Sequence, residues 1–116
     1  MKENKLLTLS QEFAVDIIKL SQLLKDVKEY GFADQIRRSG TSISANIAEG
    51  NHPQSRADMI SKFEIALKES NETENWLEIF QKSQLLEGDI VENLHKKLIK
   101  IKILLISSIK TLKSKV

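Results

Sequence analysis

The chain has 116 residues, no cysteine, one proline and four glycines, which predicts one domain over residues 1–116 and excludes disulfides and thiolate metal sites. Its longest aliphatic run is residues 103–106, whereas a membrane span needs about 20 apolar residues. Because residues 1–9 also lack a signal-peptide pattern, we expect a soluble, cytoplasmic protein with no membrane partner. Residues 1–92 carry 11 basic and all 16 acidic side chains, whereas residues 93–116 carry seven lysines.

Hydrophobic spacing predicts the first two helices. The first covers about residues 8–30, with a capping box at Thr8 and Gln11 and a stop at Gly31. Its apolar stripe consists of Leu9, Phe13, Ile17, Leu20, Leu24 and Val27. The second helix covers about residues 33–51 and ends before Pro53. Its core face holds Ile36, Gly40, Ile43 and Ile47. Glycine inside a helix costs about 1 kcal/mol relative to alanine, so Gly40 predicts close approach of a neighbouring backbone.

The same spacing predicts two longer helices in the second half. The third covers about residues 55–84 and begins with a Ser55 cap. Its stripe is Met59, Phe63, Ala66, Ser70, Thr73, Leu77 and Phe80, and its small, polar middle suits the small residues of the second helix. Gly88 separates it from the fourth helix, about residues 89–113, which opens with a cap pattern at Asp89 and Glu92.

The fourth helix has more apolar surface than one seam uses. The predicted seam is Val91, Leu94, Leu98, Ile101, Leu105, Ser108 and Leu112, and the apolar residues left over are Ile99, Ile103, Leu104, Ile106 and Ile109. Short connections favour an all-α, antiparallel up-down-up-down four-helix bundle. The spare apolar surface predicts a second contact, most simply with another copy of the chain.

The sequence offers no catalytic or cofactor motif. Two Glu-x-x-His matches, Glu49 with His52 and Glu92 with His95, have the spacing used in di-iron bundles. The third helix would hold them about 40 Å apart, so we expect no shared metal. Glu74 and Glu78 lie one turn apart, where a solvated acidic face or an inter-subunit ion-pair surface is favoured over acid–base chemistry. We therefore expect neither enzyme activity nor a cofactor.

Basic and polar residues leave two interpretations open. Arg37 and Arg38 can contact phosphate, or they can bond a carboxylate on another helix or subunit, with Glu49, Glu72 and Glu74 as candidates. The lysines can bind a polyanion or can form a solvated face. The candidate nucleic-acid-binding residues are Arg37, Arg38, Lys96, Lys97, Lys100, Lys102, Lys110 and Lys113, and the candidate structural polar residues are Asn46, Glu49, Glu72 and Glu74. Trp76 is expected to pack rather than stack on bases.

Two parts of the chain resemble a known protein family. The first part is residues 35–38 (QIRR) and 45–50 (ANIAEG), and the second is residues 63–67 (FEIAL) followed by Ser70, Glu72 and Glu74. They resemble the four-helix-bundle proteins named after the intervening sequences of large-subunit ribosomal RNA genes. The resemblance implies a left-handed antiparallel bundle that assembles as a homopentamer. It also implies kinship with a diversity-generating retroelement accessory protein thought to engage nucleic acid and a reverse transcriptase. Residues 52–54 (HPQ) replace the family's usual glycine-and-basic connector.

Two hypotheses of function follow. The first is a non-enzymatic oligomer that binds RNA or DNA through basic surfaces, motivated by the lysines of residues 93–116 with Arg37 and Arg38. The alternative is a protein–protein scaffold with no nucleic-acid ligand, motivated by the spare apolar surface and the few aromatic residues.

Overall fold

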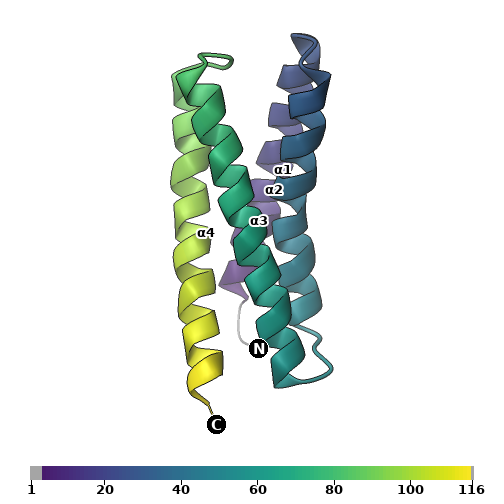
Figure 1. Cartoon of the computed structure of the whole chain (residues 1–116), viewed down its shortest axis with the longest axis vertical. Coiled ribbons are helices and arrows are strands. Elements are labelled where there is room, and N and C mark those ends of the chain that lie inside the picture. Colours follow the sequence, from purple (N-terminus) through teal and green to yellow (C-terminus); the bar gives the residue numbers. More distant parts are fainter. Residues whose placement is uncertain (1–3, 116) are drawn as a thin grey trace.

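The computed structural model describes residues 4–115 and consists of four α-helices (Figure 1). They are α1 (Lys5–Asp26), α2 (Tyr30–Gly50), α3 (Arg56–Lys82) and α4 (Gly88–Ser114). Each helix packs against the next in the chain, and α4 packs against α1, which closes the ring of four. The helices run alternately up and down along a long axis of 49 Å. The predicted all-α, up-down-up-down bundle is therefore confirmed.

The core follows the predicted stripes closely. All four predicted residues of α2 are buried, as are the predicted members of α3 from Phe63 to Phe80. Some positions differ. Val27 lies beyond the end of α1 and is 56% exposed, and Ile109 rather than Leu112 continues the buried face of α4. Leu9, Met59 and Ser108 are only half-buried. Full burial of an isoleucine, leucine or phenylalanine stabilises the fold by about 1.5–3 kcal/mol per side chain, so these stripes hold the bundle together.

The polar middle of α3 faces α2, as the sequence predicts. The hydroxyl groups of Thr73 and Ser39 are hydrogen-bonded at 2.9 Å and both side chains are fully buried. Thr73 also donates to the main-chain carbonyl of Glu69 at 2.8 Å. The buried hydroxyls are thus satisfied, which removes the cost of burying a polar group without a partner.

The start of α1 differs from the prediction. The helix begins at Lys5, because the Asn4 side chain accepts a hydrogen bond from the Leu7 amide at 3.1 Å. The predicted Thr8–Gln11 capping box is therefore wrong. The earlier start brings Leu6 onto the buried face, and this burial favours the extra turn. The Ser55 cap of α3 is confirmed, since its hydroxyl accepts from the Asp58 amide at 3.0 Å.

Two turns use residues other than glycine in the left-handed region. Lys28 has φ of 66° between α1 and α2, and Gln84 has φ of 56° between α3 and α4. Gly31 and Gly88, predicted as breakers, instead lie in the first turns of α2 and α4. The cap at Asp89 is also wrong, because α4 begins at Gly88 with Glu87 as a cap residue that makes no side-chain bond. Glycine disfavours a helix by only about 1 kcal/mol relative to alanine, and the packing of a whole helix can outweigh this cost.

Gly40 marks a very close helix contact, although its neighbour is a side chain rather than the backbone that the sequence led us to expect. A Cβ atom at Gly40 would lie 2.7 Å from Cγ2 and 2.8 Å from Cγ1 of Ile17 on α1. Gly50 is similar, since its Cβ would lie 2.6 Å from the Phe63 ring. A β-branched side chain on a helix has little rotamer freedom, so Ile17 cannot easily move aside.

We predict that Gly40→Ala destabilises the protein by about 1–3 kcal/mol, because overpacking outweighs the roughly 1 kcal/mol gain in helix propensity. Gly31→Ala is the matched control in the same helix, since a Cβ there meets nothing within 4 Å, and it should be neutral or stabilising. Urea unfolding of both variants measures the difference. Equal stabilisation by both substitutions would contradict the assigned close contact.

Candidate functional site

Arg38 joins α2 to α3. Its guanidinium group donates to Glu69 Oε2 at 3.1 Å and also bonds Glu72 Oε2. The bond to Glu72 raises the pKa of Arg38, and the Arg38 guanidinium lowers the pKa of Glu72. The Arg38 side chain is 52% exposed, so solvent screening limits such pairs to below about 1 kcal/mol. Arg38 therefore has a structural contact in the folded chain.

Trp76 extends this contact into an aromatic cluster. Its indole Nε1 donates to Glu72 Oε2 at 3.1 Å. The ring lies 5.9 Å from Phe32 in an edge-on arrangement and 6.5 Å from Phe80 in a stacked one. The indole N–H of Trp76 is thus hydrogen-bonded and its ring is packed against other aromatic rings, which is a typical structural role for a tryptophan.

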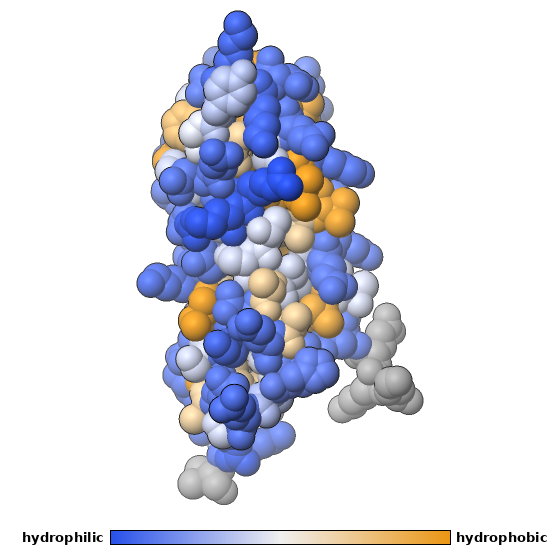
Figure 2. All heavy atoms as spheres, turned by 90° about the vertical axis from the view of Figure 1, so that its right-hand side faces the viewer, coloured by the Kyte–Doolittle hydropathy of each residue, from blue (hydrophilic) through white to orange (hydrophobic). Residues whose placement is uncertain are grey.

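The other polar candidates of α2 do not converge on Arg38. Asn46 donates to the Ser42 carbonyl at 2.8 Å within its own helix, and Glu49 lies 3.4 Å from Lys62 on α3. Arg37 forms no ion pair among residues 4–115. Figure 2, which views the bundle from the α1 and α2 side, shows mostly hydrophilic residues with separate apolar patches. On this face the structure brings together no group of predicted binding residues.

Four of the lysines of α4 are paired with carboxylates. Three of these pairs reach other helices: Lys97 with Asp16 at 2.6 Å, Lys102 with Glu74 at 2.6 Å and Lys113 with Glu64 at 2.9 Å. The fourth, Lys96 with Glu92 at 3.7 Å, is an exposed pair one turn apart on α4. Lys100 and Lys110 have no ion pair within the described range. The two flanks of α4 are therefore fastened to α1 and α3 by charge.

Three lysines lie on the side of α4 that faces away from the bundle. Positions 96, 100, 103, 107 and 110 recur at three- and four-residue steps, so they share one helix face, and all are exposed. We call this set the outer face of α4; its members are Lys96, Lys100, Ile103, Ser107 and Lys110. Ile103 is 61% exposed, and Ile106 beside it is also exposed. Ile99 and Leu104 are half-buried, whereas Ile109 belongs to the core. The outer face thus combines positive charge with apolar surface.

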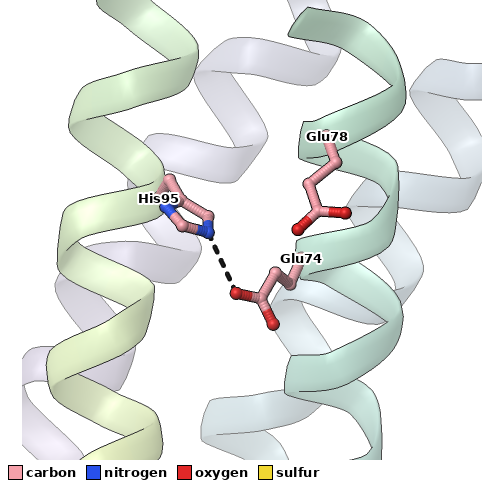
Figure 3. A group of neighbouring side chains, drawn as sticks. All are labelled: Glu74, Glu78 and His95. Carbon is pink, nitrogen blue, oxygen red and sulfur yellow. Dashed lines mark hydrogen bonds and ion pairs between the residues drawn. The ribbon is translucent and has the colours of Figure 1, made fainter. Parts of the chain in front are cut away.

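A compact polar group lies between α3 and α4. His95 Nε2 is 2.9 Å from Glu74 Oε2, and Lys102 donates to Glu74 Oε1 at 2.6 Å. The Lys102 bond, followed by the His95 bond, lowers the pKa of Glu74. Figure 3 shows the Glu78 carboxylate on α3 turned toward the same space. The sequence pairs His95 only with Glu92, because the contact with Glu74 depends on the register between two helices and leaves no local pattern.

Residues 2–107 match the family model described as 23S rRNA-intervening sequence protein. The chain belongs to this family. A solved structure of a protein with unknown function from the S23 ribosomal protein family of Bacteroides thetaiotaomicron VPI-5482 is 46% identical to it. The match covers 90% of this chain and 98% of that chain, with a TM-score of 0.88. The expected resemblance is thereby confirmed. No curated protein matches the chain.

Family membership fixes the bundle and leaves the biochemical role open, since the similar structure is of a protein with unknown function. Within residues 4–115, no helix combines the length and hydropathy needed to cross a membrane. Two groups of polar residues therefore stand out as candidates for a ligand: the outer face of α4 and the polar group around Glu74.

We predict that the Glu74–Lys102 contact stabilises the fold in a pH-dependent way. The folded-state pKa of Glu74 lies below its ordinary value of 4.5. Its ionised form therefore contributes stability above about pH 4.5, and this contribution is lost as the pH falls through the folded-state value. Glu74→Gln should cost about 1 kcal/mol near pH 7 and progressively less below pH 4.5, as measured by urea unfolding at each pH.

Lys102→Met provides the control for this prediction. In the Glu74→Gln background, Lys102→Met should have a smaller effect than in the wild type, because its charged partner is gone. A cost of Glu74→Gln that stays constant from pH 7 to pH 3 would contradict the assignment.

Proposed function

We propose that the protein is a non-enzymatic, homo-oligomeric bundle that binds RNA or DNA through the outer face of α4. The supporting observation is the exposed set Lys96, Lys100 and Lys110 on a helix that carries no acidic residue after Glu92. A helix face with one sign of charge attracts the phosphate backbone and releases counterions from it. The proposal therefore rests on three of the lysines named from the sequence, which share one surface; Arg37, exposed on α2, lies apart from them.

The basic side chains that pair with carboxylates on other helices also favour the outer face of α4 as the binding surface. Arg38, Lys97, Lys102 and Lys113 already contact carboxylates of the bundle. A phosphate group would have to displace those carboxylates, whereas Lys100 and Lys110 have no such partner among residues 4–115. Contacts to phosphate carry no base information, and Trp76 is packed against Phe32 and Phe80. The proposed binding is therefore largely independent of sequence.

The side chains of the core support a non-enzymatic role. Buried hydroxyl groups bond main-chain carbonyls of their own helices: Ser10 bonds Leu7, Ser21 bonds Ile18 and Ser70 bonds Ala66. The hydroxyls of these serines are thus occupied by their own helices instead of facing a base. His95 is bonded to a carboxylate whose other oxygen is held by Lys102, and nucleophilic catalysis requires a base within reach of a hydroxyl or thiol.

Self-association is the second part of the proposal. Ile99, Ile103 and Ile106 recur at steps of four and three residues on the side of α4 toward α3, and Ile103 and Ile106 are exposed. Burying them against another copy removes apolar surface from water. The family resemblance suggests five copies. A ring would repeat the lysine surface once per copy, and repeated weak contacts on one polymer raise the overall affinity strongly.

The alternative is a protein–protein scaffold that covers the whole outer face of α4 and binds no nucleic acid. The 61% exposure of Ile103 in the middle of the lysines favours it, because aliphatic anchors ringed by polar residues are common in protein interfaces. Neutralising the lysines separates the two functions, since phosphate binding depends on their charge and an apolar interface depends mainly on Ile103.

For nucleic-acid binding, the decisive variant is Lys96→Gln/Lys100→Gln/Lys110→Gln. With a fluorescent single-stranded RNA at low salt, we expect at least tenfold weaker binding. We also expect a slope of log K against log salt that is smaller by about two, given roughly 0.7 counterions released per contact. The control triple Lys19→Gln/Lys68→Gln/Lys82→Gln removes the same charge from exposed positions on α1 and α3 and should bind nearly as the wild type does. Equal loss in both triples, or no binding by the wild type, would refute the proposal.

For self-association, we predict that analytical ultracentrifugation of the wild type gives a multiple of the 13.2 kDa chain mass, with five copies expected from the resemblance. Ile103→Ser should shift the protein toward smaller species, because it removes an apolar contact worth about 1.5–3 kcal/mol per copy. Val15→Ser, at an exposed position on α1, is the control. A wild-type monomer at micromolar concentration would contradict this part.

A further inference from the structure

The polar group between α3 and α4 has the composition of a metal site. One oxygen each of Glu74 and Glu78 and a ring nitrogen of His95 lie within 4.8 Å of one another. Two of these residues are one turn apart on α3, and the third projects toward them from α4 (Figure 3). A cation placed among them would bridge two helices that the chain connects only through residues 83–87.

Local charge favours a cation at this point. Two carboxylates four residues apart on a helix repel each other at a cost of about 0.2–0.5 kcal/mol. Lys102 offsets the charge of Glu74, but Glu78 forms no salt bridge with any residue of the range 4–115. The region around His95 therefore retains one carboxylate without a positive partner.

The orientation of Glu74 is suited to binding through a single oxygen. Lys102 holds Oε1 at 2.6 Å, which leaves Oε2 directed at His95 Nε2 at 2.9 Å. Ligating carboxylates in metal sites are commonly fixed in this way by a hydrogen bond to the second oxygen. Nε2 and Oε2 therefore face each other, and a small widening of their 2.9 Å separation would admit a metal ion between them.

The donor set points to the kind of ion. Imidazole with carboxylate oxygens suits zinc and similar divalent transition metals, whereas calcium and magnesium prefer oxygen alone. Zinc bonds of about 2.0–2.2 Å place tetrahedral ligands roughly 3.4 Å apart. The 2.9 Å separation of His95 and Glu74 must therefore widen, while the longest separation, within 4.8 Å, must shorten. Glu78 is exposed and the His95 side chain is 37% exposed, and side-chain rotation can supply this movement.

We infer that Glu74, Glu78 and His95 bind a divalent transition-metal ion of the zinc class at the α3–α4 surface, with a fourth position open to solvent. The ion clamps α4 to α3 near the turn that connects them. This site is different from the two Glu-x-x-His matches of the sequence. In the described structure Glu92 pairs with Lys96 instead of contributing to it, and His52 lies in the segment between α2 and α3.

Titration of metal-free protein with Zn²⁺, followed by calorimetry, tests the inference. We expect one ion per chain and a rise in the unfolding temperature with Zn²⁺, since a ligand that binds only the folded state stabilises it. Glu78→Gln should weaken Zn²⁺ binding at least tenfold while the fold is retained, because Glu78 is exposed and forms no ion pair in residues 4–115. His95→Ala should weaken it at least as much.

His52→Ala is the matched control, because His52 and His95 are the two histidines of the chain. It should leave both the affinity and the stoichiometry unchanged. Absence of Zn²⁺ binding by the wild type at about 100 μM, or an equal loss of affinity in His52→Ala, would overturn the inference. Since Mg²⁺ does not favour imidazole, binding of Mg²⁺ as tight as that of Zn²⁺ would overturn the assigned ion class.

Discussion

The arrangement of the bundle depends on how the charge of α4 is neutralised. After Glu92 this helix has no acidic residue, so the lysines beyond Lys96 find carboxylate partners only on other helices. Asp16 on α1 holds Lys97, while Glu64 and Glu74 on α3 hold Lys113 and Lys102. These exposed or half-exposed pairs are individually weak. Together they specify which flank of α4 faces which neighbour, and they leave the outer face positively charged.

Packing among α1, α2 and α3 depends on close steric fit as well as on the ion pairs of Arg38 and Lys62 between α2 and α3. The contact of Ile17 with Gly40 lets α1 approach α2 closely, and the contact of Phe63 with Gly50 does the same for α3. Dense packing makes such contacts sensitive to a single added methyl group. The first half of the bundle is therefore a rigid support. The two surfaces that we propose for ligands, the outer face and the group around Glu74, lie on α3 and α4.

Sequence reasoning predicted the buried stripes well because helical side-chain positions follow directly from a period of 3.6 residues. It was less successful at helix ends, where burial of Leu6 extends α1 and where Lys28 makes the turn that Gly31 was expected to make. The contact between His95 and Glu74 could not be predicted, since it depends on how far α4 slides along α3. Lysine counts alone also could not show which lysines pair with carboxylates of other helices and which lie on the outer face of α4.

The most direct test of the account is lysine footprinting by acetylation, read by mass spectrometry with and without a single-stranded RNA. If the outer face of α4 contacts the phosphate backbone, Lys96, Lys100 and Lys110 lose reactivity when RNA is added, while Lys19 and Lys82 keep theirs. Uniform reactivity in both states, or protection centred on Lys19 and Lys82, would contradict the central claim that the lysines on the outer face of α4 form the ligand surface.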